Sequence, residues 1–299
     1  MNRPSKTQLA LLLLALGSAT DATRAAETAT PLPSLAVVSP GVPGENKMVG
    51  TYAQPEWSAR RPFPGVSVYV QPAAQIEFES GFQETTTPSG RHHREWTQEL
   101  EAGLGHRWQL AVENTVANFH EGSSRPPRWG EDAVAVAVRY ALADWGKLPL
   151  NPAVGAGWEF KSGTADVPNA QLVLGDEFTP RLHWAADCKY GRQTGGRHLR
   201  DLSVATALTY SVTNETLNVG VQAQWKRSSE TLDPQSTRLE AGPCVQYRPI
   251  DQLHFDCVAL WGRERGKPVH GLFLSVGFEF GPGADDHDDE RERGGRLAH

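Results

Sequence analysis

The sequence contains no apolar run long enough for a membrane-spanning helix, which needs about 20 consecutive apolar residues. Its longest apolar block, Leu9–Leu16, is much shorter than that. Hydrophobic residues make up 39% of the chain and charged residues 21%, a composition that excludes a helical membrane protein. Strands in which apolar and polar side chains alternate would not be visible in such averages, because the two kinds of residue cancel.

Cysteine is also scarce, since only Cys188, Cys244 and Cys257 occur in 299 residues. Three cysteines do not form a disulfide framework for an exported chain, and no histidine or second cysteine lies at the spacing of metal ligands. We therefore expect small apolar fillers at these positions, no metal site and no cofactor. The net charge of −6 comes without a basic cluster, which argues against a nucleic-acid partner.

The first 26 residues have the pattern of a cleavable secretory signal. Arg3 and Lys6 precede the apolar block, and small residues follow it up to Ala26. This pattern predicts that residues 1–26 are a signal peptide and that the chain is exported.

Two further segments lack regular periodicity. Residues 27–65 are rich in proline, glycine, serine and threonine, and we interpret them as a periplasmic leader or as a plug for the fold that follows. The residues that would dock such a plug are Trp57, Arg60, Arg61 and Phe63. Residues 281–299 are acidic and predict a disordered, solvated C-terminal tail.

From Val66 to Phe280 the dominant pattern is alternation with a period of two, which is typical of strands with one apolar face. In the last stretch, for example, Leu272, Leu274 and Val276 share one face, and glycine, serine and glutamate occupy the other. The pattern predicts twelve strands, at about 66–79, 94–104, 108–116, 133–142, 153–161, 168–175, 181–190, 202–212, 217–226, 238–248, 253–261 and 268–280.

The links between these strands differ in length according to their order. Short links follow the second, fourth, eighth and tenth strands, and longer polar links follow the first, third, seventh and ninth. Short turns at one end and long loops at the other are typical of outer-membrane barrels, in which the short turns are periplasmic. A sandwich with Greek-key links would not sort its loops in this way.

The aromatic residues give a second test, because they fall on the apolar faces and near the two ends of the strands. Aromatic rings gather at the two lipid–water boundaries of membrane barrels, whereas those of a soluble core would gather in mid-strand. The residues predicted to form these two girdles include Trp96, Trp108, Tyr140, Trp158, Trp184, Tyr190, Tyr210, Trp225, Tyr247, Trp261, Phe278 and Phe280.

Together these patterns predict an all-β fold, a single up-and-down antiparallel transmembrane β-barrel of about 12 strands over residues 66–280. The closing stretch Pro268–Phe280 resembles the aromatic-bearing last strand of Gram-negative outer-membrane barrels, which serves there as an assembly signal. The overall layout is similar to outer-membrane transport barrels of poorly known function, including a group linked to phenol degradation. The resemblance implies an outer-membrane location, with lipid, lipopolysaccharide and the barrel-assembly machinery as partners. It transfers no functional residue.

If the apolar faces meet lipid, the opposite faces line a lumen with many charges. Acids concentrate on the first three strands and bases are frequent on the seventh and tenth, so we expect a divided lumen with opposed charges. The residues predicted to line it are Glu77, Glu79, Glu99, Glu101, Glu113, Arg139, Glu159, Lys161, Arg181, His183, Asp187, Lys189, Arg238, Glu240, Arg248, His254 and Asp256. These charges must meet water or pair with each other, because an unpaired buried charge is costly.

Three functions remain open from the sequence. A channel or transporter for small solutes is favoured, and a structural or envelope-interaction barrel with a self-filled lumen is the main alternative. The third is a lipid hydrolase, since Ser80 and His270 face outward on strands that closure would bring together. An enzyme is not expected, because no orienting Asn or Asp accompanies the pair.

Overall fold

The computed structural model describes residues 48–86, 88–90, 92–119, 128–196, 198–213, 216–229 and 236–281. The predicted signal peptide, the start of the predicted leader and residues 282–299 of the predicted tail lie outside these ranges.

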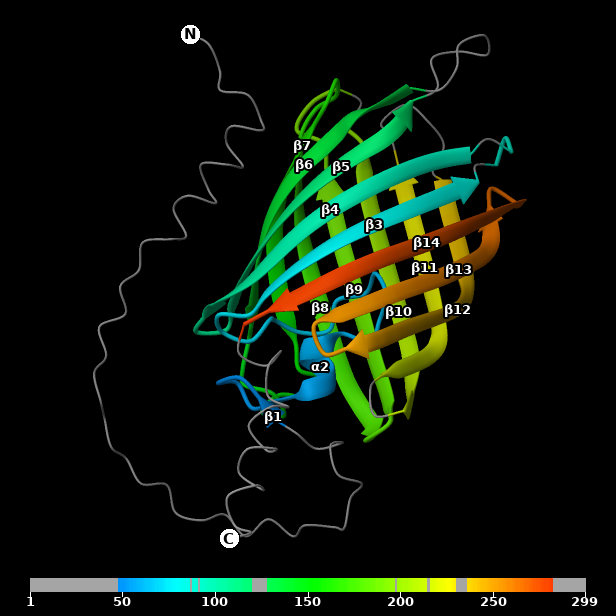
Figure 1. The fold of residues 1–299 in the computed structure, drawn as a ribbon. Helices are drawn as coiled ribbons and strands as arrows, with labels where there is room; N and C mark the ends of the chain where they lie inside the picture. Colours follow the sequence, from blue (N-terminus) through cyan, green and yellow to red (C-terminus); the bar gives the residue numbers. More distant parts are fainter. Residues whose placement is uncertain are drawn as a thin grey trace, which may run out of the picture.

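Within these described ranges, twelve antiparallel strands close into one barrel (Figure 1). Each strand pairs with its neighbours in sequence, and β14 pairs with β3 to close the wall, Phe278 standing opposite Phe78. The strands are β3 (Ile76–Thr86), β4 (His92–Gly105), β5 (Trp108–Phe119), β6 (Arg128–Ala141), β7 (Ala153–Lys161), β8 (Val167–Thr179), β9 (Leu182–Arg192), β10 (Arg200–Thr213), β11 (Leu217–Ser229), β12 (Ser236–Ile250), β13 (Leu253–Glu264) and β14 (Lys267–Phe280). The predicted strand number, direction and closure are confirmed.

One boundary predicted from the sequence is wrong. The first barrel strand begins at Ile76 and not at Val66. Val66, Val68 and Val70 do alternate, but they are buried inside the barrel instead of facing outward. Packing inside a lumen can therefore produce the same period of two as packing against lipid.

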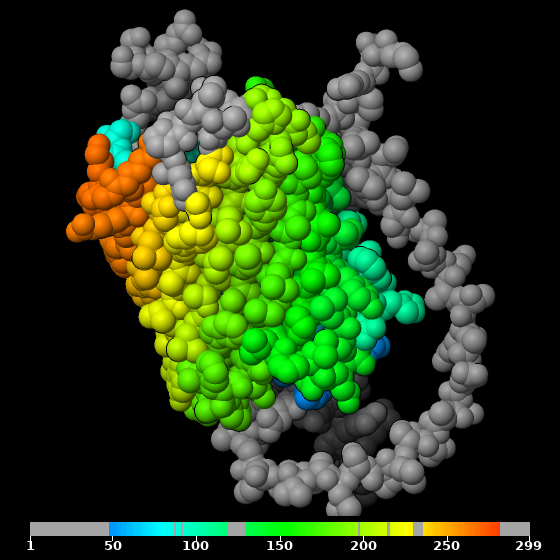
Figure 2. Space-filling view, turned by 180° about the vertical axis from the view of Figure 1, so that it is seen from behind, coloured from blue at the N-terminus to red at the C-terminus, as the bar shows by residue number. Residues whose placement is uncertain are grey.

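The outer surface of the barrel is apolar. Large hydrophobic side chains are exposed along the strands, among them Val221, Leu239 and Trp261, each with 58% of its surface accessible. The wall is a continuous layer of side chains (Figure 2). So large an apolar surface is suited to lipid and not to water.

All twelve predicted girdle aromatics lie on this outer surface, exposed or half-exposed. Trp108 and Tyr140 are cross-strand neighbours with ring centroids 4.7 Å apart, next to the short β4–β5 turn. Phe278 and Phe280 pack 5.2 Å apart at the same end of the barrel.

Residues 48–75, here called the plug, enter the lumen from the end with the short turns (Figure 1). They contain β1 (Met48–Val49), β2 (Gln54–Pro55) and the helix α2 (Glu56–Arg60), followed by an irregular segment. In the part of the chain that the structure describes, no helix has the length and apolar character needed to cross a membrane.

The plug has its own apolar core against the wall. Trp57, Phe63, Val68 and other plug side chains pack with small inward residues of β6 to β10. Those wall residues are Ala141, Ala153, Val173, Ala185 and Ala207. The run of small inward side chains on these strands thus leaves the space that the plug occupies.

Candidate solute pathway

The lumen is divided into a lower part filled by the plug and an upper part that is open. The plug is docked first by aromatic contacts. Trp57 stacks on His183 with ring centroids 4.3 Å apart, and its indole nitrogen donates to Glu177 at 2.8 Å. The Tyr69 hydroxyl donates to the backbone carbonyl of Ala143 in the β6–β7 link.

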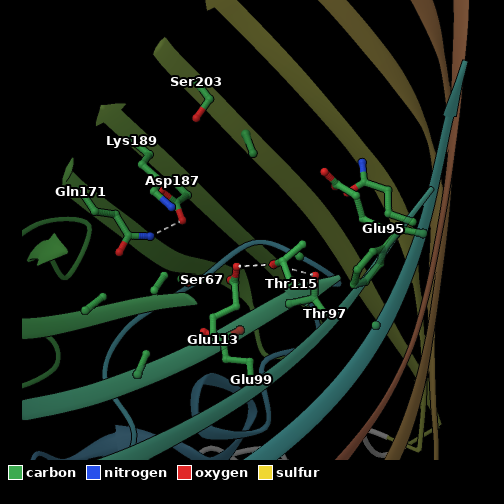
Figure 3. A pocket seen from close by; sticks show the side chains of 18 of the residues that line it. Ser67, Glu95, Thr97, Glu99, Glu113, Thr115, Gln171, Asp187, Lys189 and Ser203 are labelled. Atoms are coloured by element: carbon green, nitrogen blue, oxygen red, sulfur yellow. Dashed lines mark hydrogen bonds between the residues drawn. The ribbon is translucent and has the colours of Figure 1, made fainter. Parts of the chain in front are cut away.

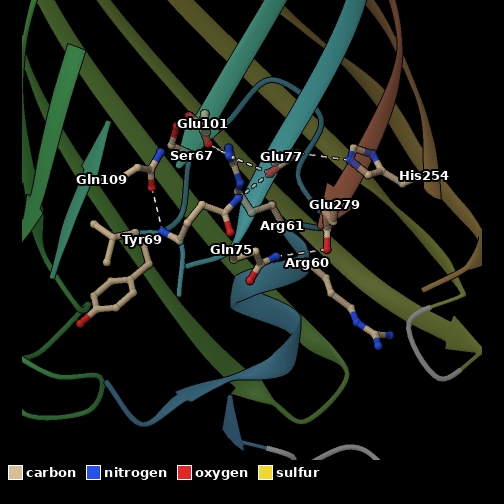
Figure 4. A network of polar contacts seen from close by, with 12 residues as sticks. Arg60, Arg61, Ser67, Tyr69, Gln75, Glu77, Glu101, Gln109, His254 and Glu279 are labelled. Carbon is tan, nitrogen blue, oxygen red and sulfur yellow. Dashed lines mark hydrogen bonds and ion pairs between the residues drawn. The ribbon is translucent and has the colours of Figure 1, made fainter. Parts of the chain in front are cut away.

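Arginines from both the plug and the wall fix the plug backbone and its charge. Arg61 of the plug forms ion pairs with Glu77, at 3.0 Å, and with Glu101 (Figure 4). In the opposite direction, Arg139 of β6 donates to the Tyr69 carbonyl at 3.0 Å, and Arg248 of β12 donates to the Arg60 carbonyl at 2.8 Å. Buried charges are thus paired across the interface between plug and wall.

The Arg61 side chain remains protonated in this position. Burial lowers the pKa of Arg61, but the surrounding carboxylates, Glu77 foremost, raise it by more, and the net pKa lies above the ordinary value. Arg61 is therefore a permanent cation that holds the plug against an acidic part of the wall.

Two wall glycines allow the plug backbone to come close. A methyl group at Gly103 of β4 would overlap the Pro72 carbonyl, and one at Gly175 of β8 would overlap the Val68 side chain. The Ala74 amide also donates to the Gly103 carbonyl at 2.9 Å, so the last part of the plug extends the hydrogen bonding of β4. Glycine is required here by contact with the plug and not by backbone conformation.

Above the plug lies a chamber of about 530 Å³ (Figure 3). Its lining includes seven carboxylates and four basic groups, a formal excess of three negative charges. The acids are Glu79, Glu95, Glu99, Glu113, Asp132, Glu159 and Asp187. The bases are Arg139, Lys161, Lys189 and Lys226.

Only some of these charged side chains form ion pairs with other residues of the wall. Lys161 contacts Glu159 at 2.7 Å and Asp132 at 3.0 Å. By contrast, Glu79 and Glu99 have no hydrogen bond or ion pair with any other described residue. Carboxyl groups without a protein partner require water or a cation, so the chamber is suited to hold both.

One side of the chamber is apolar. Val258, Leu260 and Phe273, on β13 and β14, line it and pack with the buried Cys244. The chamber is thus lined mostly by charged and polar side chains, with one small apolar patch.

The predicted lumen residues fall into three groups. Those that line the chamber are Glu79, Glu99, Glu113, Arg139, Glu159, Lys161, Asp187 and Lys189. Those that lie around the plug are Glu77, Glu101, His183, Arg248, His254 and Asp256. The remaining three are Arg181 in the β8–β9 turn and the Arg238–Glu240 pair on β12.

Of the bases predicted to oppose the acids across an open lumen, Lys189 lines the chamber, but Arg238 and Arg248 do not. Arg238 contacts Glu240 at 2.5 Å, and Arg248 contacts Glu279 at 2.8 Å and supports the plug. Neither lines the chamber. The cations that do so are lysines of β7, β9 and β11 together with Arg139 of β6.

Three charged residues of the chamber were missed. Lys226 has the inward parity of its strand and could have been chosen. Asp132 could not, because the register of β5 and β6 shifts there: Thr115 pairs with Ala133 but Val116 pairs with Glu131. The extra residue of this bulge breaks the alternation on which the sequence analysis depends. Glu95 has the parity of Glu99 within the predicted strand 94–104 and could also have been chosen.

The residues proposed for a hydrolase do not come together. Ser80 stands opposite Val276 across the seam between β3 and β14, six residues along β14 from His270. That offset is about 20 Å at roughly 3.3 Å per residue. The Ser80 hydroxyl instead accepts a hydrogen bond from the Trp96 indole at 2.9 Å.

No protein-family model and no curated protein matches the chain. Among solved structures, it is similar to the COG4313 outer membrane channel from Pseudomonas putida F1, with a TM-score of 0.53 and 11% identity over 73% of this chain and 99% of that one. The NanC porin gives a TM-score of 0.48 and 15% identity over 68% of this chain and 98% of the porin. The KdgM porin gives 0.43 and 10% over 70% and 100%.

The likeness to the COG4313 channel concerns the fold, and it agrees with the closed wall, the apolar outer surface and the aromatic residues at its edges. The chain is a twelve-stranded transmembrane β-barrel with the fold of Gram-negative outer-membrane channels.

Proposed function

We propose that this barrel is an outer-membrane channel for small polar solutes, that it prefers cations, and that the plug gates it. The observation that carries the proposal is the chamber of about 530 Å³ directly above the plug, lined by seven acidic and four basic side chains. A self-filled structural barrel would have no need of so large a hydrated space lined by carboxylates without protein partners.

The proposed route follows from the two ends of the barrel. In barrels of this kind the short turns are periplasmic and the long loops extracellular. Gln83, Asp132 and Lys226, which line the chamber, lie near the long-loop ends of their strands. A solute would thus enter the chamber from outside, and it would reach the periplasm only when the plug shifts from its contacts with β4, β8 and β12.

The preference for cations has an electrostatic basis. Fixed carboxylates in a narrow space raise the local concentration of cations and lower that of anions. Glu99 and Glu113 face each other as cross-strand partners on β4 and β5, and both line the chamber. They are the carboxylates most suited to set this preference.

The test is the reversal potential of the purified mature chain in a planar bilayer under a KCl gradient. Wild type is expected to conduct intermittently and to select potassium over chloride, and the Glu99→Gln/Glu113→Gln variant is expected to lose most of that selectivity. Glu84→Gln, which changes a carboxylate at the outer rim paired with Arg94, is the matched control and should behave as wild type. Chloride selectivity, or unchanged selectivity in the double variant, would refute the proposed role of the chamber.

The structural alternative rests on a specific observation, the filling of the lower lumen by the plug. It predicts that neither wild type nor a variant with a weakened plug conducts. We favour a channel without enzymatic activity, because the Ser80 and His270 pair is separated. Contacts with lipopolysaccharide and with the barrel-assembly machinery remain proposals based on the fold.

A further inference from the structure

A second, smaller cavity lies between the plug and the wall. Its volume is about 110 Å³, and plug residues from Arg61 to Ser67 form one side. The wall contributes Glu77, Glu79, Glu99, Glu101, His254 and Asp256. The cavity therefore brings together five carboxylates and an imidazole around a single guanidinium group.

Arg61 balances only part of this charge. Its ion pairs go to Glu77 and Glu101. Glu79 and Glu99 have no hydrogen bond or ion pair with other described residues, and Asp256 contacts only His254 and Ser275. Arg139 adds a second guanidinium group 4.0 Å from Glu101. Two guanidinium groups against five carboxylates still leave an excess of acidic groups in an enclosed space, which calls for a further cation.

Three of these groups are placed as metal ligands. One ligand atom from each of Glu79, His254 and Asp256 lies within 4.8 Å of the others. Asp256 is only 5% exposed and its Oδ1 has no hydrogen-bond partner, while its Oδ2 lies 2.8 Å from His254 Nδ1. Two ligands about 2.1 Å from a tetrahedral ion are about 3.4 Å apart, so a small widening of this spacing accommodates an ion that takes the place of the Nδ1 proton.

The other nitrogen of the same imidazole is also held. His254 Nε2 lies 3.3 Å from Glu77 Oε1, which would orient the ring as carboxylates commonly orient metal-binding histidines. The ring fits because its cross-strand neighbour on β14 is Gly277, where a methyl group would overlap the imidazole.

A second set of potential ligands, Glu77, His254 and Glu279, is less suited to an ion. Glu77 already accepts from Gln71 at 2.5 Å and pairs with Arg61. Glu279 pairs with Arg248 at 2.8 Å. This set is neutralised by protein groups and does not need a metal.

We propose that a divalent transition-metal ion such as Zn²⁺ binds in this cavity, held by Glu79, His254 and Asp256. One imidazole nitrogen and two carboxylates form a donor set that suits zinc, and water can complete its coordination. The site joins β3 and β13 directly beside the plug. It concerns metal binding alone and does not depend on whether the barrel conducts.

The experiment is isothermal titration of Zn²⁺ into the chelator-treated, detergent-solubilised full chain. Wild type is expected to bind one ion per chain, and Asp256→Asn and His254→Gln are each expected to weaken binding at least tenfold. Asp201→Asn and His93→Gln, which change the same residue types outside the cavity, are matched controls that should bind as wild type does.

X-ray absorption at the zinc edge, on the wild-type complex, supplies a second readout that a folding defect in a variant does not affect. One imidazole nitrogen with oxygen ligands supports the site. The proposal fails if wild type binds no stoichiometric zinc, if several imidazoles coordinate the ion, or if both cavity variants bind as the controls do.

Discussion

Arg61 is the residue on which the position of the plug depends most. Arg61→Ala removes the closest countercharge of Glu77 and Glu101, leaving them only His254 at 3.3 Å and Arg139 at 4.0 Å, and loss of one member of a buried pair costs on the order of 3 kcal/mol. A shift of only about 1.4 kcal/mol would raise the ratio of open to closed channels about tenfold. Single-channel recordings should therefore show a large rise in open probability for this variant.

Arg94→Ala is the matched control for that recording. Arg94 pairs with Glu84 at 2.6 Å at the exposed rim, where an ion pair contributes little. The open probability of the Arg94→Ala channel should equal that of wild type. An Arg61→Ala channel that opens no more often than Arg94→Ala would show that this ion-pair cluster does not hold the plug.

At the scale of the elements, the backbones of β4 and the plug come into close contact at Gly103. Gly103→Ala places a methyl group against the Pro72 carbonyl, and such overpacking costs about 1–3 kcal/mol. The plug is expected to loosen while the barrel remains closed, so that limited proteolysis cuts within residues 48–75 much faster than in wild type. Gly195→Ala, where the added group would meet only an ordinary contact, should be cut at the wild-type rate. Equal rates for the two variants would contradict the docking described for β4.

The elements also show where sequence reasoning succeeds and where it stops. All twelve strands were predictable because a wall between lipid and lumen imposes a period of two on every strand. The same period in Val66, Val68 and Val70 comes from packing inside the lumen, and nothing local distinguishes the two environments. At Asp132 a bulge reverses the faces, and bulges have no clear signature in a single sequence.

The partners of the lumen charges were harder still to predict. Parity placed Arg238 and Arg248 inside, but it could not show that Glu240 and Glu279 would engage them, nor that the plug would cover Arg248. Those pairings depend on register between strands and on a segment that precedes the barrel. The inward direction of a charge is thus a local property, whereas its availability to a solute is a property of the whole molecule.

At the scale of the whole molecule, we propose that movement of the plug opens the acidic chamber to the other side of the membrane. A reversible cross-link between plug and wall tests this directly. Val68 and Gly175 are in contact across the interface, so cysteines at both positions meet the short Cβ separation that a disulfide needs. Cys188, Cys244 and Cys257 are replaced by alanine so that only one disulfide can form.

The decisive measurement is the bilayer conductance of this Val68→Cys/Gly175→Cys channel before and after addition of a reducing agent, with the disulfide verified by mass spectrometry. We expect a silent channel when the disulfide is formed and intermittent, cation-selective openings once the bond is reduced. Equal conductance in the oxidised and reduced states would contradict gating by the plug.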